Sequence, residues 1–350
     1  MASTDTAAYL ETISEAIKSV DNHVIDFDGR VAIVTGAAGG LGRLYALELA
    51  ARGAKIMVND AGGPVDGRET SPGAAESVAM EIRAMGGQAM SHNADVSDES
   101  QVAAMIEQIL ARWGRIDILI NNAGILRDSA FVDTRVEDIQ KVMDVHLMGS
   151  ILCSKAVWPH MLAAGYGRIL MISSIGGLYG APGRAGYGTA KMGVIGLMHV
   201  LQKEGETRGI RINSLSPAAA TRMTEDLPED LRALADPHAI TPAAIFLVSD
   251  VAPANTILAA AAGGYSRIIL YDTPGISLAR EDWTPEAIAA GFEAISDPAD
   301  AVHYQDGLSH FMKFITRAAA HQYTPAAKSL AAAICKEDGE KRHPQQGERS

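Results

Sequence analysis

Residues 31–42 are VAIVTGAAGGLG, an apolar run that leads directly into a glycine-rich loop. The stretch that overlaps its end, LGRLYALELAARG (41–53), carries apolar residues at helical spacing. Gly36, Gly40 and Gly42 therefore lie between a strand and a helix. There they let the backbone turn tightly and approach a pyrophosphate at the helix N-terminus. The stretch predicts the first strand and helix of a dinucleotide-binding sheet, with Leu41 in the same loop.

The same alternation of strand and helix continues along the chain. Further strands are predicted at 54–60, 87–96, 117–124, 167–174, 211–217 and 265–272, and helical stretches at 73–87, 98–114, 135–162 and 187–204. Such repetition implies parallel strands joined by right-handed crossovers, and the nearly all-apolar strands imply helices on both faces. The predicted fold class is α/β, a single Rossmann-type doubly wound parallel sheet with an N-terminal helix and a C-terminal extension.

This reading divides the chain into four segments. They are an N-terminal helical extension (1–29), a catalytic Rossmann domain that binds a dinucleotide (30–272), a C-terminal extension (273–335) and a charged, disordered tail (336–350).

Composition excludes several classes of function. The 350 residues include 30 Lys plus Arg and 42 Asp plus Glu, and the net charge of -12 disfavours nucleic acid as a partner. The two cysteines have no metal-ligand spacing, so we expect no metal site and a reducing compartment. Neither a signal peptide, nor an apolar run long enough to span a membrane, nor a Ser-Lys-Leu type C-terminus is present, and we expect a cytoplasmic protein.

Acidic and amide side chains follow the predicted strands. Asp60 ends the second strand, where a carboxylate would accept hydrogen bonds from ribose hydroxyls and repel a 2′-phosphate, which favours NAD over NADP. The alternative is that Asp60 caps the loop that follows it. Asp95, with Val96, ends the third strand near the expected adenine, and Asn122 in NNAG (121–124) ends the fourth.

A hydroxyl, a phenol and an amine occur in SSIGGLYGAPGRAGYGTAK (173–191). Ser174 ends a strand, and Tyr187 and Lys191 lie four positions apart at the start of a helical stretch, so they share a face. An ammonium about 4 Å from a phenol is worth about 4 kcal/mol at an effective dielectric constant of 20, or roughly three pKa units. We therefore predict that Lys191 lowers the pKa of Tyr187 toward that of a general base, with an oxidised nicotinamide acting in the same direction.

The motifs TGAAGGLG and NNAG, with Ser174 thirteen positions before the YxxxK motif that begins at Tyr187, resemble the short-chain dehydrogenase/reductase family over roughly residues 25–265. Within it, VNDAGG, NNAGILRDSAF and YGRILMISSIGGLYG resemble the (3R)-hydroxyacyl-CoA dehydrogenase, or 17β-hydroxysteroid dehydrogenase type 4, part of multifunctional enzyme type 2. The resemblance implies that Tyr187 is the acid/base, that Lys191 lowers its pKa and holds the ribose, and that Ser174 donates to the substrate oxygen.

The resemblance also assigns the wider site. The residues expected to bind NAD are Gly36, Gly40, Leu41, Gly42, Asp60, Asp95, Val96, Asn122, Ala123, Gly124, Tyr187, Lys191, Pro217, Ala219 and Thr221. The chain departs from the family at two positions: His146 replaces a usual Asn, and Ala218 replaces a usual Gly. His146 is either a fourth catalytic residue or a packed helix residue.

Apolar side chains surround the expected substrate end. The residues expected to contact the substrate are Ser174, Leu126, Ile175, Tyr179 and Met223. They favour a hydrophobic secondary alcohol or its ketone, such as a (3R)-3-hydroxyacyl-CoA or a 17β-hydroxysteroid. The alternatives are another bulky aryl or terpenoid alcohol, or a catalytically silent dinucleotide-binding protein. The family resemblance further implies a homodimer or homotetramer.

Overall fold

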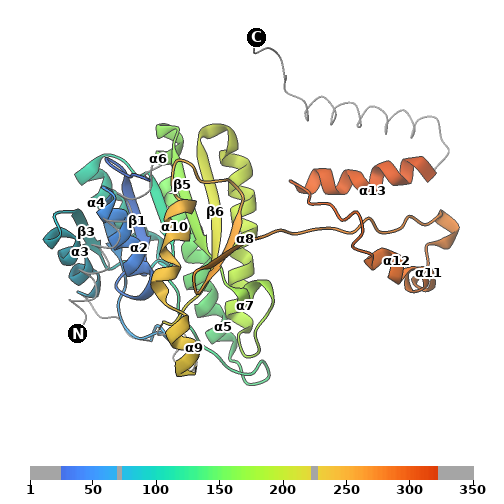
Figure 1. The fold of residues 1–350 in the computed structure, drawn as a ribbon, viewed down its shortest axis with the longest axis horizontal. Coiled ribbons are helices and arrows are strands. Elements are labelled where there is room, and N and C mark those ends of the chain that lie inside the picture. Colours follow the sequence, from blue (N-terminus) through green and yellow to red (C-terminus); the bar gives the residue numbers. More distant parts are fainter. Residues whose placement is uncertain (1–24, 69–72, 222–227, 322–350) are drawn as a thin grey trace, which may run out of the picture. The chain divides into compact units, whose positions relative to one another are not determined.

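The computed structural model describes residues 25–68, 73–221 and 228–321. They contain one eight-stranded sheet of order β3-β2-β1-β4-β5-β6-β7-β8 (Figure 1). The strands are β1 (Val31–Thr35), β2 (Lys55–Asn59), β3 (Gln88–His92), β4 (Ile118–Asn121), β5 (Gly167–Ile172), β6 (Ile210–Ala218), β7 (Ile257–Ala261) and β8 (Gly264–Ile268). The order reverses between β1 and β4, and all neighbouring pairs are parallel except β7 with β8. The doubly wound α/β prediction is confirmed.

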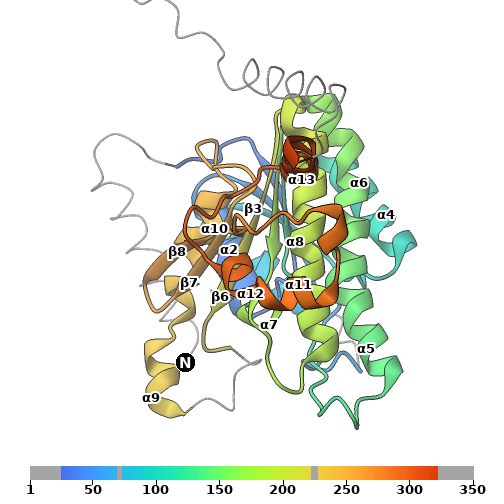
Figure 2. The same ribbon diagram turned by 90° about the vertical axis from the view of Figure 1, so that its right-hand side faces the viewer.

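Helices cover both faces of the sheet. One face packs against α2 (Gly40–Ala51), α3 (Ala74–Ala84) and α10 (Thr241–Leu247). The other packs against α4 (Glu99–Trp113), α6 (Gly149–Ala164) and α8 (Ala185–Gly205), which Figure 2 shows together on one side. Shorter elements near the carboxyl ends of the strands are α5 (Val136–Met143), α7 (Ile175–Leu178) and α9 (Glu229–Leu234), and the 3₁₀ turns are η2 (Glu206–Arg208) and η4 (Pro237–Ala239).

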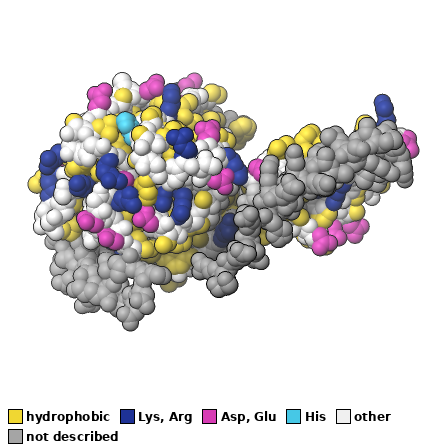
Figure 3. Space-filling view, turned by 90° about the horizontal axis from the view of Figure 1, so that it is seen from above, with side chains coloured by type: hydrophobic (Ala, Val, Ile, Leu, Met, Phe, Trp, Pro, Cys, Tyr) yellow, Lys and Arg dark blue, Asp and Glu magenta, His cyan; other side chains and the backbone are white. Residues whose placement is uncertain are grey.

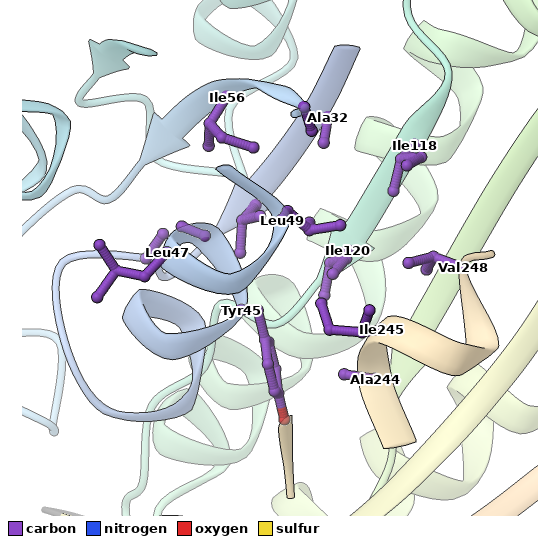
Figure 4. Close-up of a cluster of buried hydrophobic side chains, with 14 of the residues drawn as sticks. Ala32, Tyr45, Leu47, Leu49, Ile56, Ile118, Ile120, Ala244, Ile245 and Val248 are labelled. Carbon is purple, nitrogen blue, oxygen red and sulfur yellow. The ribbon is translucent and has the colours of Figure 1, made fainter. Parts of the chain in front are cut away.

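The core beneath α2 explains why the strands are so apolar. Tyr45 and Leu49 of α2 are fully buried, and with Ile120 of β4 and Ile245 of α10 they belong to one cluster (Figure 4). Each large apolar side chain buried in this way stabilises the fold by about 1.5–3 kcal/mol. Because helices bury both faces, successive strand residues are apolar rather than alternating with polar ones.

The edge of the sheet differs from the prediction. β7 was not predicted, because ILAAA is mostly alanine, which is a poor strand former. The strand expected at 265–272 is β8, which ends at Ile268 and runs antiparallel to β7. Ala262 (φ 46°) and Gly263 (φ 76°) form the turn between them, and two successive positive φ values suit a tight hairpin.

The helical stretch predicted at 135–162 is interrupted. A π-helical turn, η1 (Asp144–Met148), joins α5 to α6, and it contains His146. One extra residue in a turn changes which side chains face the sheet, and π turns often occur at functional sites.

The chain separates into two compact units, residues 1–268 and 269–350. The described part of the second unit contains η5 (Arg280–Asp282), α11 (Pro285–Ala290), α12 (Phe292–Ser296) and α13 (Gly307–His321). Asp272 organises it: its backbone pairs with Val302, and its carboxylate accepts a 2.6 Å hydrogen bond from Lys313 Nζ. The tail predicted at 336–350 and residues 1–24 of the predicted N-terminal extension lie outside the described residues.

The surface carries both signs of charge. On the face shown in Figure 3, basic and acidic side chains are interspersed among hydrophobic ones. Among the described helices, none combines the length and the hydropathy needed to cross a membrane.

Candidate active site

A cleft of about 760 Å³ lies at the carboxyl ends of the parallel strands, the edge where open α/β sheets bind ligands. Nineteen of the residues predicted to form the site line it: Gly36, Gly40, Leu41, Gly42, Asp60, Asp95, Val96, Asn122, Ala123, Gly124, Leu126, His146, Ser174, Ile175, Tyr187, Lys191, Pro217, Ala219 and Thr221. Tyr179, at the end of α7, is 75% exposed and is not among the residues that line it. Met223 lies outside the described residues.

The glycine loop packs closely against the end of β4. A Cβ atom at Gly42 would lie 2.3 Å from the Gly36 carbonyl oxygen and 2.5 Å from Asn122 Nδ2. Only a residue without a side chain fits there, so Gly42 sets the distance between α2 and the sheet. Gly40, by contrast, has open space where a Cβ would be, and it faces the cleft.

The Asp60 carboxylate binds the backbone of two loops, the glycine loop after β1 and its own loop after β2. Its Oδ2 accepts a 2.8 Å hydrogen bond from the Ala38 amide, and its Oδ1 accepts a 2.7 Å bond from the Gly62 amide. The capping role that the sequence left open is therefore present. It is compatible with the expected cofactor role, because each carboxylate oxygen retains a second lone pair and Asp60 lines the cleft.

Asn122 joins two strand ends. Its Nδ2 donates to the carbonyl oxygens of Thr35 (2.9 Å) and Gly36 (3.0 Å), and the amides of Asn122 and Ala123 donate to Thr35 Oγ1. The Asn122 side chain thus satisfies irregular backbone at the end of β1. This network fixes the edge between β1 and β4 along which a dinucleotide would lie.

Asp95 is similarly engaged near the expected adenine. Its carboxylate accepts from Ser97 Oγ (2.6 Å) and Lys141 Nζ (3.3 Å). Burial raises the pKa of Asp95, but the hydrogen bonds from Ser97 and the charge of Lys141 outweigh it and hold the pKa below its ordinary value. The carboxylate is therefore ionised and held in place.

Ser174 and Tyr187 meet at the other end of the cleft. Ser174 lies two residues beyond the end of β5 and accepts a 3.1 Å hydrogen bond from the Gly176 amide, which caps α7. Burial raises the pKa of Tyr187, and a side-chain hydrogen bond with Ser174 opposes that rise without cancelling it. The sequence predicted a lowered pKa for this phenol. The difference arises because desolvation of a buried phenolate outweighs the charges near it.

Lys191 is buried next to Tyr187, at the wall of the cleft. Its Nζ donates a 2.6 Å hydrogen bond to the Ile172 carbonyl oxygen and lies 5.6 Å from the centre of the Tyr187 ring. Burial lowers the pKa of Lys191 to about 7. The amine is therefore poised between its two protonation states at neutral pH, rather than being the fixed cation that the sequence suggested.

The enclosed amine gives stability a specific pH dependence. In the unfolded chain Lys191 keeps its proton up to about pH 10.4, whereas in the folded chain it loses the proton near pH 7. Burial of the charged amine therefore lowers the free energy of unfolding most below pH 7, and this loss of stability disappears between the two pKa values. We expect Lys191→Met to be more stable than the unsubstituted protein at pH 7, with an advantage that shrinks by up to about 1.4 kcal/mol per pH unit toward pH 10. Urea unfolding across pH measures this, and a constant difference would contradict it. The exposed Lys155, replaced by Met, is the control.

His146 packs edge-on against Tyr187. The ring centres are 5.1 Å apart, and His146 Nε2 lies 2.7 Å from the Ile125 carbonyl oxygen. Burial, with the charge of Lys191, lowers the pKa of His146 well below its ordinary range, so the ring is neutral. A Cβ at Gly124 would lie 2.2 Å from His146 Cε1. The His146 side chain therefore forms part of the cleft wall beside Tyr187. This position is compatible with both expectations for His146, a fourth catalytic residue or a packed helix residue.

Some cleft residues were not predicted. They are Asn59, Ala61, Gly62, Gly63, Pro64, Val65, Gly67, Ala94, Lys141, Val145, Ala261 and Ala262, among others. The polar, glycine-rich composition of residues 61–71 was the one available signal for the loop after β2. The Val65 carbonyl oxygen accepts a 3.0 Å hydrogen bond from the Leu126 amide, which places this loop over the cleft.

Fold and site together define a dinucleotide-dependent enzyme class. Residues 30–232 match the short chain dehydrogenase family, and the chain belongs to that family as an oxidoreductase enzyme. Among its relatives, peroxisomal multifunctional enzyme type 2 of Mus musculus is 40% identical over 279 residues, 79% of this chain and 38% of the mouse protein.

Two solved structures are similar to this chain in fold and in sequence. Full-length peroxisomal multifunctional enzyme type 2 from Drosophila melanogaster matches 82% of this chain and 48% of its own, with 34% identity and a TM-score of 0.69. A 7α-hydroxysteroid dehydrogenase complexed with NADH and 7-oxo glycochenodeoxycholic acid matches 68% of this chain and 95% of its own, with 28% identity and a TM-score of 0.62. The chain spans between 32% and 62% of the length of the curated multifunctional relatives it matches.

Proposed function

We propose that this chain uses NAD to interconvert a hydrophobic secondary alcohol and its ketone, with a (3R)-3-hydroxyacyl-CoA as the first substrate class to test and a 17β-hydroxysteroid as the second. One observation carries the proposal. A single cleft holds the glycine loop at one end and Ser174, Tyr187 and Lys191 at the other. A dinucleotide lying along the strand ends would thus meet the three polar groups.

The three side chains divide the chemistry. Ser174 Oγ would donate to the substrate oxygen. During oxidation Tyr187, as a phenolate, would take the alcohol proton, and during reduction the Tyr187 hydroxyl would give that proton to the carbonyl oxygen. The cofactor, when bound, supplies the hydride acceptor and a positive charge that favours the phenolate. Lys191 keeps its amine beneath the phenol through its bond to the Ile172 carbonyl oxygen. The burial of Tyr187 and Lys191 keeps water from competing for the proton.

Charges at the ribose end support NAD over NADP. Asp60 presents a carboxylate where a 2′-phosphate would be repelled. Arg43, on the first turn of α2, donates to the Glu81 carboxylate through Nε at 3.0 Å and through Nη2 at 2.5 Å. Glu81 therefore already balances the positive charge of Arg43, which a 2′-phosphate would otherwise attract.

Asp60→Asn is expected to reduce the preference for NAD over NADP about tenfold, equivalent to about 1.4 kcal/mol, because the change removes a negative charge. The Asn oxygen can accept from only one of the two amides that Asp60 binds, so some loss of stability is expected with it. The ratio of kcat/KM values for the two cofactors measures this. Asp66→Asn, in the same loop, is the matched control because Asp66 pairs with Arg68 outside the cleft. An unchanged ratio in Asp60→Asn would remove Asp60 from cofactor selection.

The names of the relatives support the choice of substrates. They include a multifunctional enzyme, a hydratase-dehydrogenase-epimerase and a hydroxysteroid dehydrogenase, and the predicted substrate residues Leu126 and Ile175 give the cleft apolar walls. A panel of acyl-CoA, steroid, aryl and terpenoid alcohols, followed by NADH absorbance, tests the proposal. Faster oxidation of aryl or terpenoid alcohols than of hydroxyacyl-CoA and steroid would overturn it.

The family resemblance and the names of the relatives also bear on the assembly and the compartment of the protein. We expect a homodimer or homotetramer, as the family resemblance implies. The names of the curated multifunctional relatives describe those proteins as peroxisomal.

A further inference from the structure

Two loops meet above the substrate end of the cleft. The first follows β4 and contains Asp128 and Ser129, and the second precedes α8 and contains Gly183 and Arg184. The Ser129 amide donates a 2.9 Å hydrogen bond to the Gly183 carbonyl oxygen, and Arg184 Nε donates a 2.8 Å bond to Asp128 Oδ2. Both side chains of this ion pair are partly shielded, with exposed fractions of 27% for Arg184 and 40% for Asp128.

The ion pair lies beside the proposed acid/base. Arg184 lines the cleft, and its guanidinium carbon is 6.0 Å from the centre of the Tyr187 ring. An arginine stays protonated at every working pH, whereas burial lowers the pKa of Lys191 to about 7. Of these two cations, Arg184 is therefore the one whose charge does not vary near neutral pH.

We propose that Arg184 is a positioning residue for Tyr187 and holds a fixed positive charge beside the phenol. Its ion pair with Asp128 fixes the position of the guanidinium group and offsets part of its charge. The proposal rests on the proposed function, in which Tyr187 carries the proton. It goes further by assigning a role to an ion pair outside the three family residues.

Arg184 and Asp128 have opposite effects on the pKa of Tyr187, and this difference distinguishes an electrostatic role of the ion pair from a purely structural one. Among the described residues, the charged or titratable groups that face Tyr187 are Lys191 on its own helix, Arg184 at the start of that helix, Asp128 on the facing loop and His146 on η1. The Ser174 hydroxyl, just after β5, is hydrogen-bonded to it. Arg184 lowers the pKa of Tyr187 and Asp128 raises it, after the larger effect of burial. Removing either partner breaks the same ion pair, but it changes the charge beside the phenol in opposite directions.

The test compares four variants: Arg184→Gln, Arg184→Lys, Asp128→Asn and, as control, Arg135→Gln, which breaks an exposed ion pair with Glu137 outside the cleft. One readout is the pH profile of kcat/KM for alcohol oxidation. The other is the titration of the Tyr187 ring by NMR of ¹³C-tyrosine-labelled protein with NAD and no substrate, assigned by Tyr187→Phe. The second readout needs no turnover, so it tests the inference even if the substrate proposal fails.

We expect Arg184→Gln to move the Tyr187 ionisation to higher pH by about half a unit or more, and Asp128→Asn to move it to lower pH by a similar amount. In Arg184→Lys and in Arg135→Gln, the Tyr187 ring should titrate at the same pH as in the unsubstituted protein. Shifts of the same sign in Arg184→Gln and Asp128→Asn would show a loop clamp without an electrostatic role and would overturn the proposal. Unshifted titration in both would overturn it as well.

Discussion

Replacing Tyr187 by Phe is expected to lower kcat for alcohol oxidation about 10³-fold, within the range of about 10² to 10⁴ for loss of a general acid or base. Phenylalanine keeps the ring that packs against His146 at 5.1 Å and loses only the hydroxyl. The fold and the glycine loop should be unaffected, so the Kd for NAD should stay within about twofold, a change below about 0.4 kcal/mol. Steady-state kinetics and calorimetric titration with NAD measure the two quantities.

A matched control distinguishes loss of the acid/base from general damage. Tyr265→Phe also removes one hydroxyl, which donates to the Ala239 carbonyl oxygen from β8, outside the cleft. That variant should keep its turnover. If Tyr187→Phe turns over as fast as Tyr265→Phe, another group moves the proton and the proposed mechanism is wrong.

Gly42→Ala is expected to lower the free energy of unfolding by about 3 kcal/mol, at the upper end for overpacking of a tight contact. The added methyl carbon would lie 2.3 Å from a backbone oxygen, and backbone cannot move away as a flexible side chain can. Urea unfolding measures the loss, and NAD binding should be lost with it because α2 must shift away from the sheet.

Gly40→Ala separates folding from binding in the same loop. Gly40 has a φ of 52°, which costs a residue with a side chain roughly 1–2 kcal/mol, but the methyl group meets no atom within 4 Å. We expect a folded protein whose NAD affinity is about tenfold lower, because the methyl group occupies space at the cleft. Equal stability of the two variants would contradict the close-packing account of Gly42.

The sequence was most informative where structure repeats. Except for the more polar edge strand β3, the strands β1 to β6 each follow from an apolar run with turn residues on either side. Ser174, Tyr187 and Lys191 come together because a strand end and the next helix start share one edge of a parallel sheet. The hairpin strand β7 was missed because alanine gives little strand preference, and the interruption by η1 leaves no mark in the apolar pattern.

Properties that depend on surroundings could not be predicted. Spacing placed Lys191 near Tyr187, but it did not show that both groups are buried deeply enough for desolvation to dominate their pKa values. Spacing also could not show that Asp60 ties down two amides, or that Tyr179 is exposed outside the cleft. Each of these outcomes depends on atoms contributed by distant parts of the chain.

Transfer of a labelled hydride tests the central claim most directly. The protein is incubated with NAD and a (3R)-3-hydroxyacyl-CoA that carries deuterium at carbon 3, and the nicotinamide is examined by NMR. The account predicts deuterium at nicotinamide carbon 4 with the unsubstituted protein, and a rate about 10³-fold lower with Tyr187→Phe. Undeuterated nicotinamide in a protein that binds NAD and the thioester, or equal labelling by both proteins, would contradict it.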